Sequence, residues 1–214
     1  MDNLSNKISN LIITDSHIIT IQKYYRGYYY RKNMKKPRDN MSLNIVEKLL
    51  DRYIETLLFL EDINKQLSSK KCRNENFPSH ISENIVKFVL LKKYKVMPCW
   101  DTKNGDLGLL NKKIEVKGFM SDGPSSFGPK ENWTWIYFID CKDCRNKNFK
   151  VYEIKLSNVN SIWRDVKISK SGKYGEIADS NKRGQLRGCF YKIFKLQLED
   201  HCRLIFDGHI SELF

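Results

Sequence analysis

The chain has 214 residues, of which 41 % are hydrophobic and 29 % are charged. This composition is typical of a folded globular protein and excludes a largely disordered or membrane-embedded chain. The 38 Lys and Arg residues outnumber the 25 Asp and Glu residues, and the resulting formal charge of +13 favours polyanionic partners such as nucleic acid.

The positive charge is concentrated at the two ends of the chain. Residues 1–40 hold 8 basic and 3 acidic side chains and residues 141–214 hold 15 and 9, whereas residues 41–80 hold 6 of each. No run of about 18 apolar residues occurs, and the 6 cysteines are too sparse for a disulfide scaffold. We therefore expect an intracellular protein, in the cytoplasm or nucleus of its host cell, with no membrane partner.

The first predicted element is a basic helix from about Asp15 to Lys35, which Pro37 ends. Residues 16–38 contain seven Lys or Arg, five Tyr and no acidic residue. This helix contains the full IQ pattern, IQxxxRGxxxR, formed by Ile21, Gln22, Arg26, Gly27 and Arg31.

The pattern resembles the IQ motifs that bind calmodulin or a related EF-hand light chain, and this resemblance implies such a partner. Two other roles stay open for a basic helix rich in tyrosine. It could contact nucleic acid through Lys, Arg and stacked rings, or pack on the core with its hydroxyls in water. We expect residues 1–40 to form a helical appendage and residues 41–214 to form the main domain.

Two more helices are predicted before the character of the chain changes. Apolar residues recur at helical spacing from Ser42 to about Leu67, and another helix begins at Pro78–Ser79. After about Lys95 the segments become short, β-branched or aromatic, and separated by Gly, Pro, Asn and Asp, as strands are: Val96–Trp100, Asp106–Leu110, Lys113–Phe119, Thr134–Asp140 and Phe149–Leu156.

The remaining signals are turns and a mixed C-terminal segment. Asn104–Gly105 and Asn111–Lys112 are typical of tight turns. Arg203–Phe206 has the pattern of a strand, and His209–Leu213 that of a final helical turn. Helices followed by a run of strands indicate the α+β class.

Asp106, Glu115 and Lys117 are the most informative residues in the chain. In a hairpin, Asp106 lies near the start of one strand, and Glu115 and Lys117 share one face of the next while Ile114 and Val116 face the core. Two carboxylates beside an ammonium suit metal-assisted hydrolysis of a phosphodiester. A solvated Glu–Lys pair on a sheet surface has the same sequence pattern.

A loop rich in Gly, Pro and Ser comes directly after this pair, with the sequence GFMSDGPSSFGP over residues 118–129. Its backbone N–H groups and hydroxyls suit close approach to phosphates, although Gly and Pro equally mark an ordinary surface connection.

Asp106-x8-Glu115-x-Lys117, the helix that carries Glu83, and the SDGPSSFGP loop together resemble the PD-(D/E)xK superfamily. More narrowly, they are similar to type II restriction endonucleases in which such a loop follows Glu-Val-Lys. The chain departs from the superfamily pattern in having Gly105, and not Pro, before Asp106. The resemblance implies a restriction-endonuclease-like fold, with a central mixed sheet flanked by helices. It also implies a divalent-metal-dependent endonuclease that cuts double-stranded DNA at a short specific sequence as a homodimer.

The resemblance assigns roles to individual residues. Asp106 and Glu115 would bind Mg²⁺, Lys117 would assist the attacking water, and Glu83 would complete the metal site. A Glu near a helix N-terminus is also favoured by the helix dipole alone. The predicted DNA contacts are Ser121, Asp122, Ser125 and Ser126 in the loop, and Lys182, Arg183, Gln185 and Arg187 further on.

Cys141 and Cys144 form a CxxC pair, with His201, Cys202 and His209 downstream. They could hold structural zinc, or the segment could be a polar turn between two strands. Two other functions also stay open: a calmodulin-binding adaptor on a catalytically inactive nuclease-like scaffold, and a structure-specific repair or resolvase nuclease.

Overall fold

A computed structural model describes residues 41–67, 76–100, 106–121, 132–167, 172–179, 190–191 and 197–214. The chain divides into two compact units, residues 1–40 with 63–73, and residues 41–62 with 74–214. The second unit contains the sheet. The predicted helix with the IQ motif lies outside the described residues.

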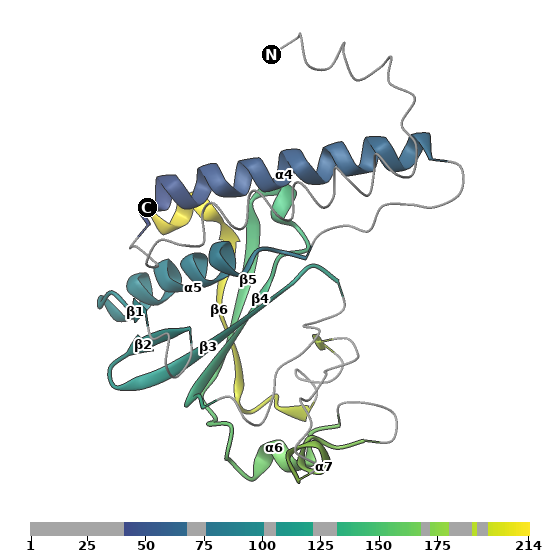
Figure 1. The fold of residues 1–214 in the computed structure, drawn as a ribbon. Coiled ribbons are helices and arrows are strands. Elements are labelled where there is room, and N and C mark those ends of the chain that lie inside the picture. Colours follow the sequence, from purple (N-terminus) through teal and green to yellow (C-terminus); the bar gives the residue numbers. More distant parts are fainter. Residues whose placement is uncertain are drawn as a thin grey trace. The chain divides into compact units, whose positions relative to one another are not determined.

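The centre of this unit is a six-stranded mixed sheet whose strands lie in chain order. The strands are β1 (Cys99–Trp100), β2 (Leu107–Leu109), β3 (Lys112–Phe119), β4 (Trp135–Asp140), β5 (Asn148–Ile154) and β6 (Cys202–His209). All neighbouring pairs are antiparallel except β3 and β4, which are parallel (Figure 1).

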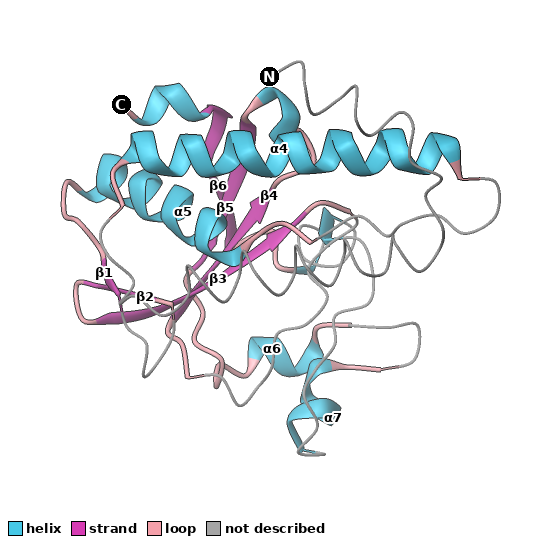
Figure 2. Ribbon diagram, turned by 45° about the horizontal axis from the view of Figure 1, so that its top comes forward, coloured by secondary structure: helices cyan, strands magenta, loops and turns pink. Residues whose placement is uncertain are grey.

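Two long helices, α4 (Leu43–Gln66) and α5 (Ser79–Tyr94), cover one face of this sheet (Figure 2). Their apolar side chains form a single buried core with inward-facing residues of the strands, among them Leu50, Ile85, Val116 and Ile139. Burial of this amphipathic surface holds the helices in place, because isolated helices of this kind are marginal in water.

Aromatic residues dominate the core on the opposite face. Trp133 and Trp163 meet edge to face at 5.4 Å between ring centroids, and Phe190 packs against Phe119, Phe138 and Tyr152. The short helices α6 (Ile162–Asp165) and α7 (Tyr174–Asp179) contribute Trp163 and Tyr174 to this core. Helices on both faces of a mixed sheet confirm the predicted α+β fold of restriction-endonuclease type.

The connection between β4 and β5 is the polar hairpin turn that the sequence offered as one interpretation of residues 141–148. It contains a short 3₁₀ turn, η2 (Cys144–Asn146), and is tied to α4 by ion pairs. Lys147 Nζ lies 2.9 Å from Glu47 Oε1 and 2.8 Å from Asp51 Oδ1, and Arg145 pairs with Glu61. The turn therefore fixes the position of α4 as well as joining two strands.

The hairpin between β2 and β3 turns one residue earlier than predicted. Leu109 pairs with Lys112, so the two central residues are Leu110 and Asn111, with φ of 50° and 60°. Positive φ at both positions is the type I′ geometry that suits the twist of a hairpin. Leucine rarely adopts it, which is why the sequence pointed to Asn111–Lys112 instead.

The first and last predicted strands have different bounds in the structure. β1 is confined to Cys99–Trp100, and Val96 and Met97 are exposed and lie outside it. β6 extends over eight residues, and a 3₁₀ turn, η4 (Ile210–Leu213), follows it. Among the described residues, no helix has the length and apolar character that crossing a membrane requires.

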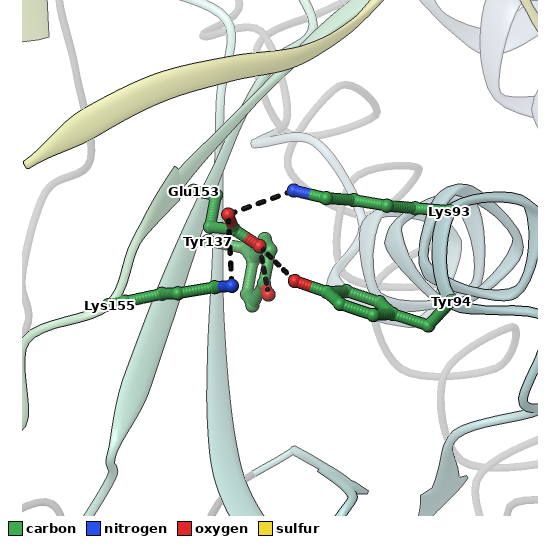
Figure 3. Close-up of polar contacts among 5 residues, drawn as sticks. All are labelled: Lys93, Tyr94, Tyr137, Glu153 and Lys155. Atoms are coloured by element: carbon green, nitrogen blue, oxygen red, sulfur yellow. Dashed lines mark hydrogen bonds and ion pairs between the residues drawn. The ribbon is translucent and has the colours of Figure 1, made fainter.

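A buried carboxylate joins α5 to the middle of the sheet (Figure 3). Glu153 on β5 is only 1 % exposed. The Tyr94 and Tyr137 hydroxyls each donate to Glu153 Oε1 at 2.8 Å, and Lys93 Nζ donates to Oε2 at 2.9 Å. Lys155 Nζ lies 3.7 Å from Oε2 and 4.6 Å from the centroid of the Trp135 ring.

This network keeps Glu153 ionised inside the protein. Burial by itself raises the pKa of the carboxyl, but the hydrogen bonds from Lys93, Tyr94 and Tyr137 hold it below its usual value. Burial and the neighbouring carboxylate also raise the pKa of Tyr137, so that its hydroxyl stays protonated and acts as a donor. The charge is thus balanced by one close ammonium and two neutral donors.

Glu153→Gln should lower the free energy of unfolding at pH 7 by about 2 kcal/mol, because the buried amide accepts more weakly than the carboxylate does, and its NH₂ group faces the donors Lys93, Tyr94 and Tyr137. Urea unfolding measures the difference. Asp207→Asn is the matched control: it breaks the exposed pair with Lys150 at 2.7 Å and should cost no more than about 1 kcal/mol.

The cost of Glu153→Gln should also depend on pH. A depressed folded-state pKa stabilises the protein fully above the unfolded carboxyl pKa of about 4.3, and this contribution is lost as the pH falls through the lower folded value. The gap between wild type and variant should therefore narrow below about pH 4. A gap that stays constant down to the acid limit of folding would contradict the proposed ionisation state.

Candidate active site

The strand β3 separates its side chains onto the two faces of the sheet. Ile114 and Val116 belong to the core beneath α4 and α5, as the alternation predicted. Gly118 faces α5 as well, where a Cβ atom would lie 3.1 Å from Ser82 Cβ. Glu115 and Lys117 therefore lie on the opposite face, together with Phe119.

Glu115 and Lys117 form an ion pair on that face, in which Lys117 Nζ donates to Glu115 Oε1. Their side chains are only 10 % and 17 % exposed, respectively. Such low exposure distinguishes the pair from a solvated Glu–Lys pair on a sheet surface, because the interaction is less screened by water. The ion pair also fixes the position of the Lys117 ammonium.

Asp106 lies immediately before β2, next to this pair. Its Oδ2 accepts a hydrogen bond from the Val116 backbone N–H at 2.9 Å, and its own N–H donates to the Ile114 carbonyl at 2.9 Å. Leu107 pairs with Ile114, so the same register continued by one residue sets Asp106 opposite Glu115. The structure thus brings Asp106, Glu115 and Lys117 together from two adjacent strands.

Glu83 has a different environment. It is 3 % exposed on α5, and α5 packs against the face of β3 that carries Val116 and Gly118. Within the described residues, no three His, Cys, Asp or Glu side chains form a group that could hold a metal ion. Glu83, Asp106 and Glu115 therefore do not form a three-carboxylate group here, and the role of Glu83 as a metal ligand stays a prediction.

Of the predicted DNA contacts, Ser121 lies among the described residues. It is exposed, two residues beyond the end of β3. Outside the described residues lie Asp122, Ser125, Ser126, Lys182, Arg183, Gln185 and Arg187.

The start of the loop after β3 is anchored by a contact that sequence reasoning missed. The Tyr53 hydroxyl of α4 donates to Met120 Sδ at 2.8 Å, and the Tyr53 ring meets Phe77 edge to face. Tyr53 falls within the apolar spacing that predicts the helix from Ser42 to about Leu67. This spacing carried no signal of a bond to a residue 67 positions away.

The CxxC pair is buried in the β4–β5 turn. Burial raises the pKa of the Cys144 thiol to about 11 and that of Cys141 well above its usual value, so both are neutral thiols in the metal-free protein. Downstream, Cys202 begins β6 and His209 ends it, so the two lie at opposite ends of the strand. The described residues thus contain no cluster suited to zinc.

Asp106, Glu115 and Lys117 thus lie together on a mixed sheet flanked by helices, which is the arrangement that the resemblance to restriction endonucleases implied. A family model described as Bsp6I restriction endonuclease matches residues 44–187, which is more than half of the chain. The chain therefore belongs to the Bsp6I restriction endonuclease family. No curated protein and no solved structure gave a significant match.

The close approach of Gly118 to Ser82 gives a test of how α5 is held against β3. Gly118→Ala should lower the free energy of unfolding by about 1–2 kcal/mol, because the new methyl group forces the helix away from the strand. Ser82→Gly alone should cost about 1 kcal/mol, from its lower helix propensity and from loss of the hydrogen bond that Ser82 Oγ donates to the Ser79 carbonyl. In the double variant the space for the methyl group is restored.

The double variant should therefore be more stable than the sum of the two single effects predicts, by about 1 kcal/mol in a double-mutant cycle. Chemical denaturation of the four proteins gives this coupling energy. Strict additivity would mean that Ser82 is not what limits the size of residue 118.

Proposed function

We propose that the protein is a Mg²⁺-dependent endonuclease that hydrolyses phosphodiester bonds of double-stranded DNA at a short specific sequence. The observation that carries the proposal is the convergence of Asp106, Glu115 and Lys117 on one half-buried face of the sheet. Membership of a restriction endonuclease family supports DNA as the substrate and a divalent metal ion as the cofactor.

The donor chemistry of the site fits magnesium. Mg²⁺ prefers hard oxygen ligands and is commonly bound by one or two carboxylates together with water and substrate phosphates. Asp106 and Glu115 would hold the ion. When bound, it would lower the pKa of an attacking water and offset charge that develops on the phosphate.

The protein's own groups prepare this reaction in two ways. The Val116 N–H orients Asp106, and the pairing of β2 with β3 holds this carboxylate beside Glu115. The Glu115 carboxylate positions the Lys117 ammonium, which can orient a water or stabilise negative charge on the phosphate oxygens. Low exposure of both side chains strengthens these electrostatic effects.

We also propose that the active form is a homodimer. A two-fold-symmetric protein places one copy of the site on each strand of a two-fold-symmetric DNA sequence, and cyclic dimers are the commonest oligomers.

Plasmid cleavage tests the main proposal. Wild type with Mg²⁺ should give discrete fragments that disappear with EDTA, and Lys117→Ala should lower the rate of cleavage about 10²–10⁴-fold. Lys150→Ala, which removes an exposed partner of Asp207 on β5, should cut as wild type does. Absence of cleavage on DNA of many sequences, methylated and unmethylated, would reject the proposal.

A second and separate proposal rests on the sequence match at Ile21, Gln22, Arg26, Gly27 and Arg31: residues 1–40 bind calmodulin or a related EF-hand protein. Ile21→Asp with Gln22→Ala should abolish binding to immobilised calmodulin in the presence or absence of Ca²⁺. DNA cleavage by the same variant should be unchanged. Equal retention of wild type and variant would exclude this interaction.

A further inference from the structure

Lys113 is a further charged residue on the face of β3 that carries Glu115 and Lys117. It is the second residue of β3, and side chains two residues apart share a face of a strand. Its main chain is firmly held, because its N–H donates to Thr134 Oγ1 at 2.8 Å and its carbonyl accepts from the Thr134 N–H at 2.8 Å. The base of the side chain is thus fixed on the same strand as the candidate catalytic residues.

The residue of β2 that lies opposite Lys113 adds no side chain to this face. Lys113 pairs with Gly108, which has no side chain, and Gly108 pairs with Cys99 of the edge strand β1. A glycine inside a strand often marks a place where a ligand or another backbone approaches closely. On the other side of Gly108, Leu107 and Leu109 point into the core and take no part in this face.

Lys113 also differs in its partners from three lysines on or next to β3 and β5. Lys117 pairs with Glu115, Lys150 with Asp207 and Lys155 with Glu153. The half-buried Lys113 side chain makes no hydrogen bond or ion pair with any residue in the described part of the chain. A partly desolvated ammonium without a counter-charge is stabilised when an anion binds beside it.

The charges of the neighbouring residues explain why the candidate site needs an ammonium group that is not already paired. Asp106 and Glu115 repel the negatively charged DNA backbone, and the ammonium of Lys117 is already paired with Glu115. Successive side chains on this face of β3 are about 6.6 Å apart, which is comparable to the distance between neighbouring phosphates of one DNA strand.

We propose that Lys113 binds a backbone phosphate of the substrate DNA adjacent to the phosphate that is cut. The inference rests on the proposed nuclease function and adds a substrate-positioning residue to it. Lys113 holds the strand in register along β3, and Gly108 leaves room for the phosphate. Lys113 makes no contact with the bases, so its contribution to binding is independent of the DNA sequence.

The test uses a DNA fragment that the wild type cuts, and a Lys117→Ala background that binds this fragment but cuts it too slowly to disturb a binding measurement. Adding Lys113→Gln should weaken binding about 10-fold and make the slope of log K against log[salt] shallower by about one. Lys113→Arg should retain both the affinity and the slope. Lys112→Gln is the matched control, since Lys112 is exposed and belongs to the opposite face of the same strand.

In the cleavage assay, Lys113→Gln alone should raise KM and leave kcat nearly unchanged. Thermal unfolding should show that Lys113→Gln and Lys112→Gln are equally folded, because the bonds to Thr134 are made by the main chain of Lys113 and not by its ammonium.

The outcomes separate the nuclease function from the role of Lys113. A wild type that cuts no DNA overturns the nuclease function and this inference with it. A wild type that cuts, with a Lys113→Gln variant whose affinity and salt slope equal those of its parent, overturns the role of Lys113 alone.

Discussion

The arrangement of this domain depends on one buried negative charge. Glu153 accepts hydrogen bonds from α5 through Lys93 and Tyr94, and from β4 through Tyr137. An isolated ion would be costly to bury, so these partners on α5 and β4 are what keeps Glu153 ionised inside the core. The network sets where the C-terminal end of α5 lies on the sheet, while the contact of Ser82 with Gly118 sets where its N-terminal end lies.

The Glu153 network and the candidate active site lie at neighbouring positions of the sheet, on its opposite faces. Tyr137 pairs with both Glu153 and Val116, and Val116 stands between Glu115 and Lys117. The side chains of Tyr137 and Glu153 face the core beneath α5, whereas Glu115 and Lys117 face away from it. The fully hydrogen-bonded Glu153 carboxylate is thus a structural group, whereas Asp106 and Glu115 are the candidate catalytic carboxylates. The network and the candidate site lie on opposite faces of one sheet and on different strands of it.

The site was predictable from sequence to the extent that it is local. β3 was placed to within one residue, since its alternation of apolar and charged side chains is a short-range signal, and Asp106 is separated from Glu115 by a single hairpin. The Glu153 network was not predictable, because its partners lie 16, 59 and 60 residues away and none has a distinctive pattern. The turn at Leu110–Asn111 was misplaced because the twist of the paired strands overrides the preference of leucine. Glu83 lies on a helix, as predicted. The sequence carried no local signal for the face of the sheet that this helix covers, because that depends on tertiary packing.

The two buried thiols in the β4–β5 turn, Cys141 and Cys144, should react slowly with thiol reagents. Thiol reagents attack the thiolate, and burial suppresses this form at Cys141 and Cys144, whereas Cys99 on the edge strand is exposed. The turn is held closed against α4 by Lys147 and Arg145. Cys141 and Cys144 should therefore be labelled only when α4 separates from the sheet. The rate of their labelling would report the rate of this local opening, and the rate at the exposed Cys99 is the reference.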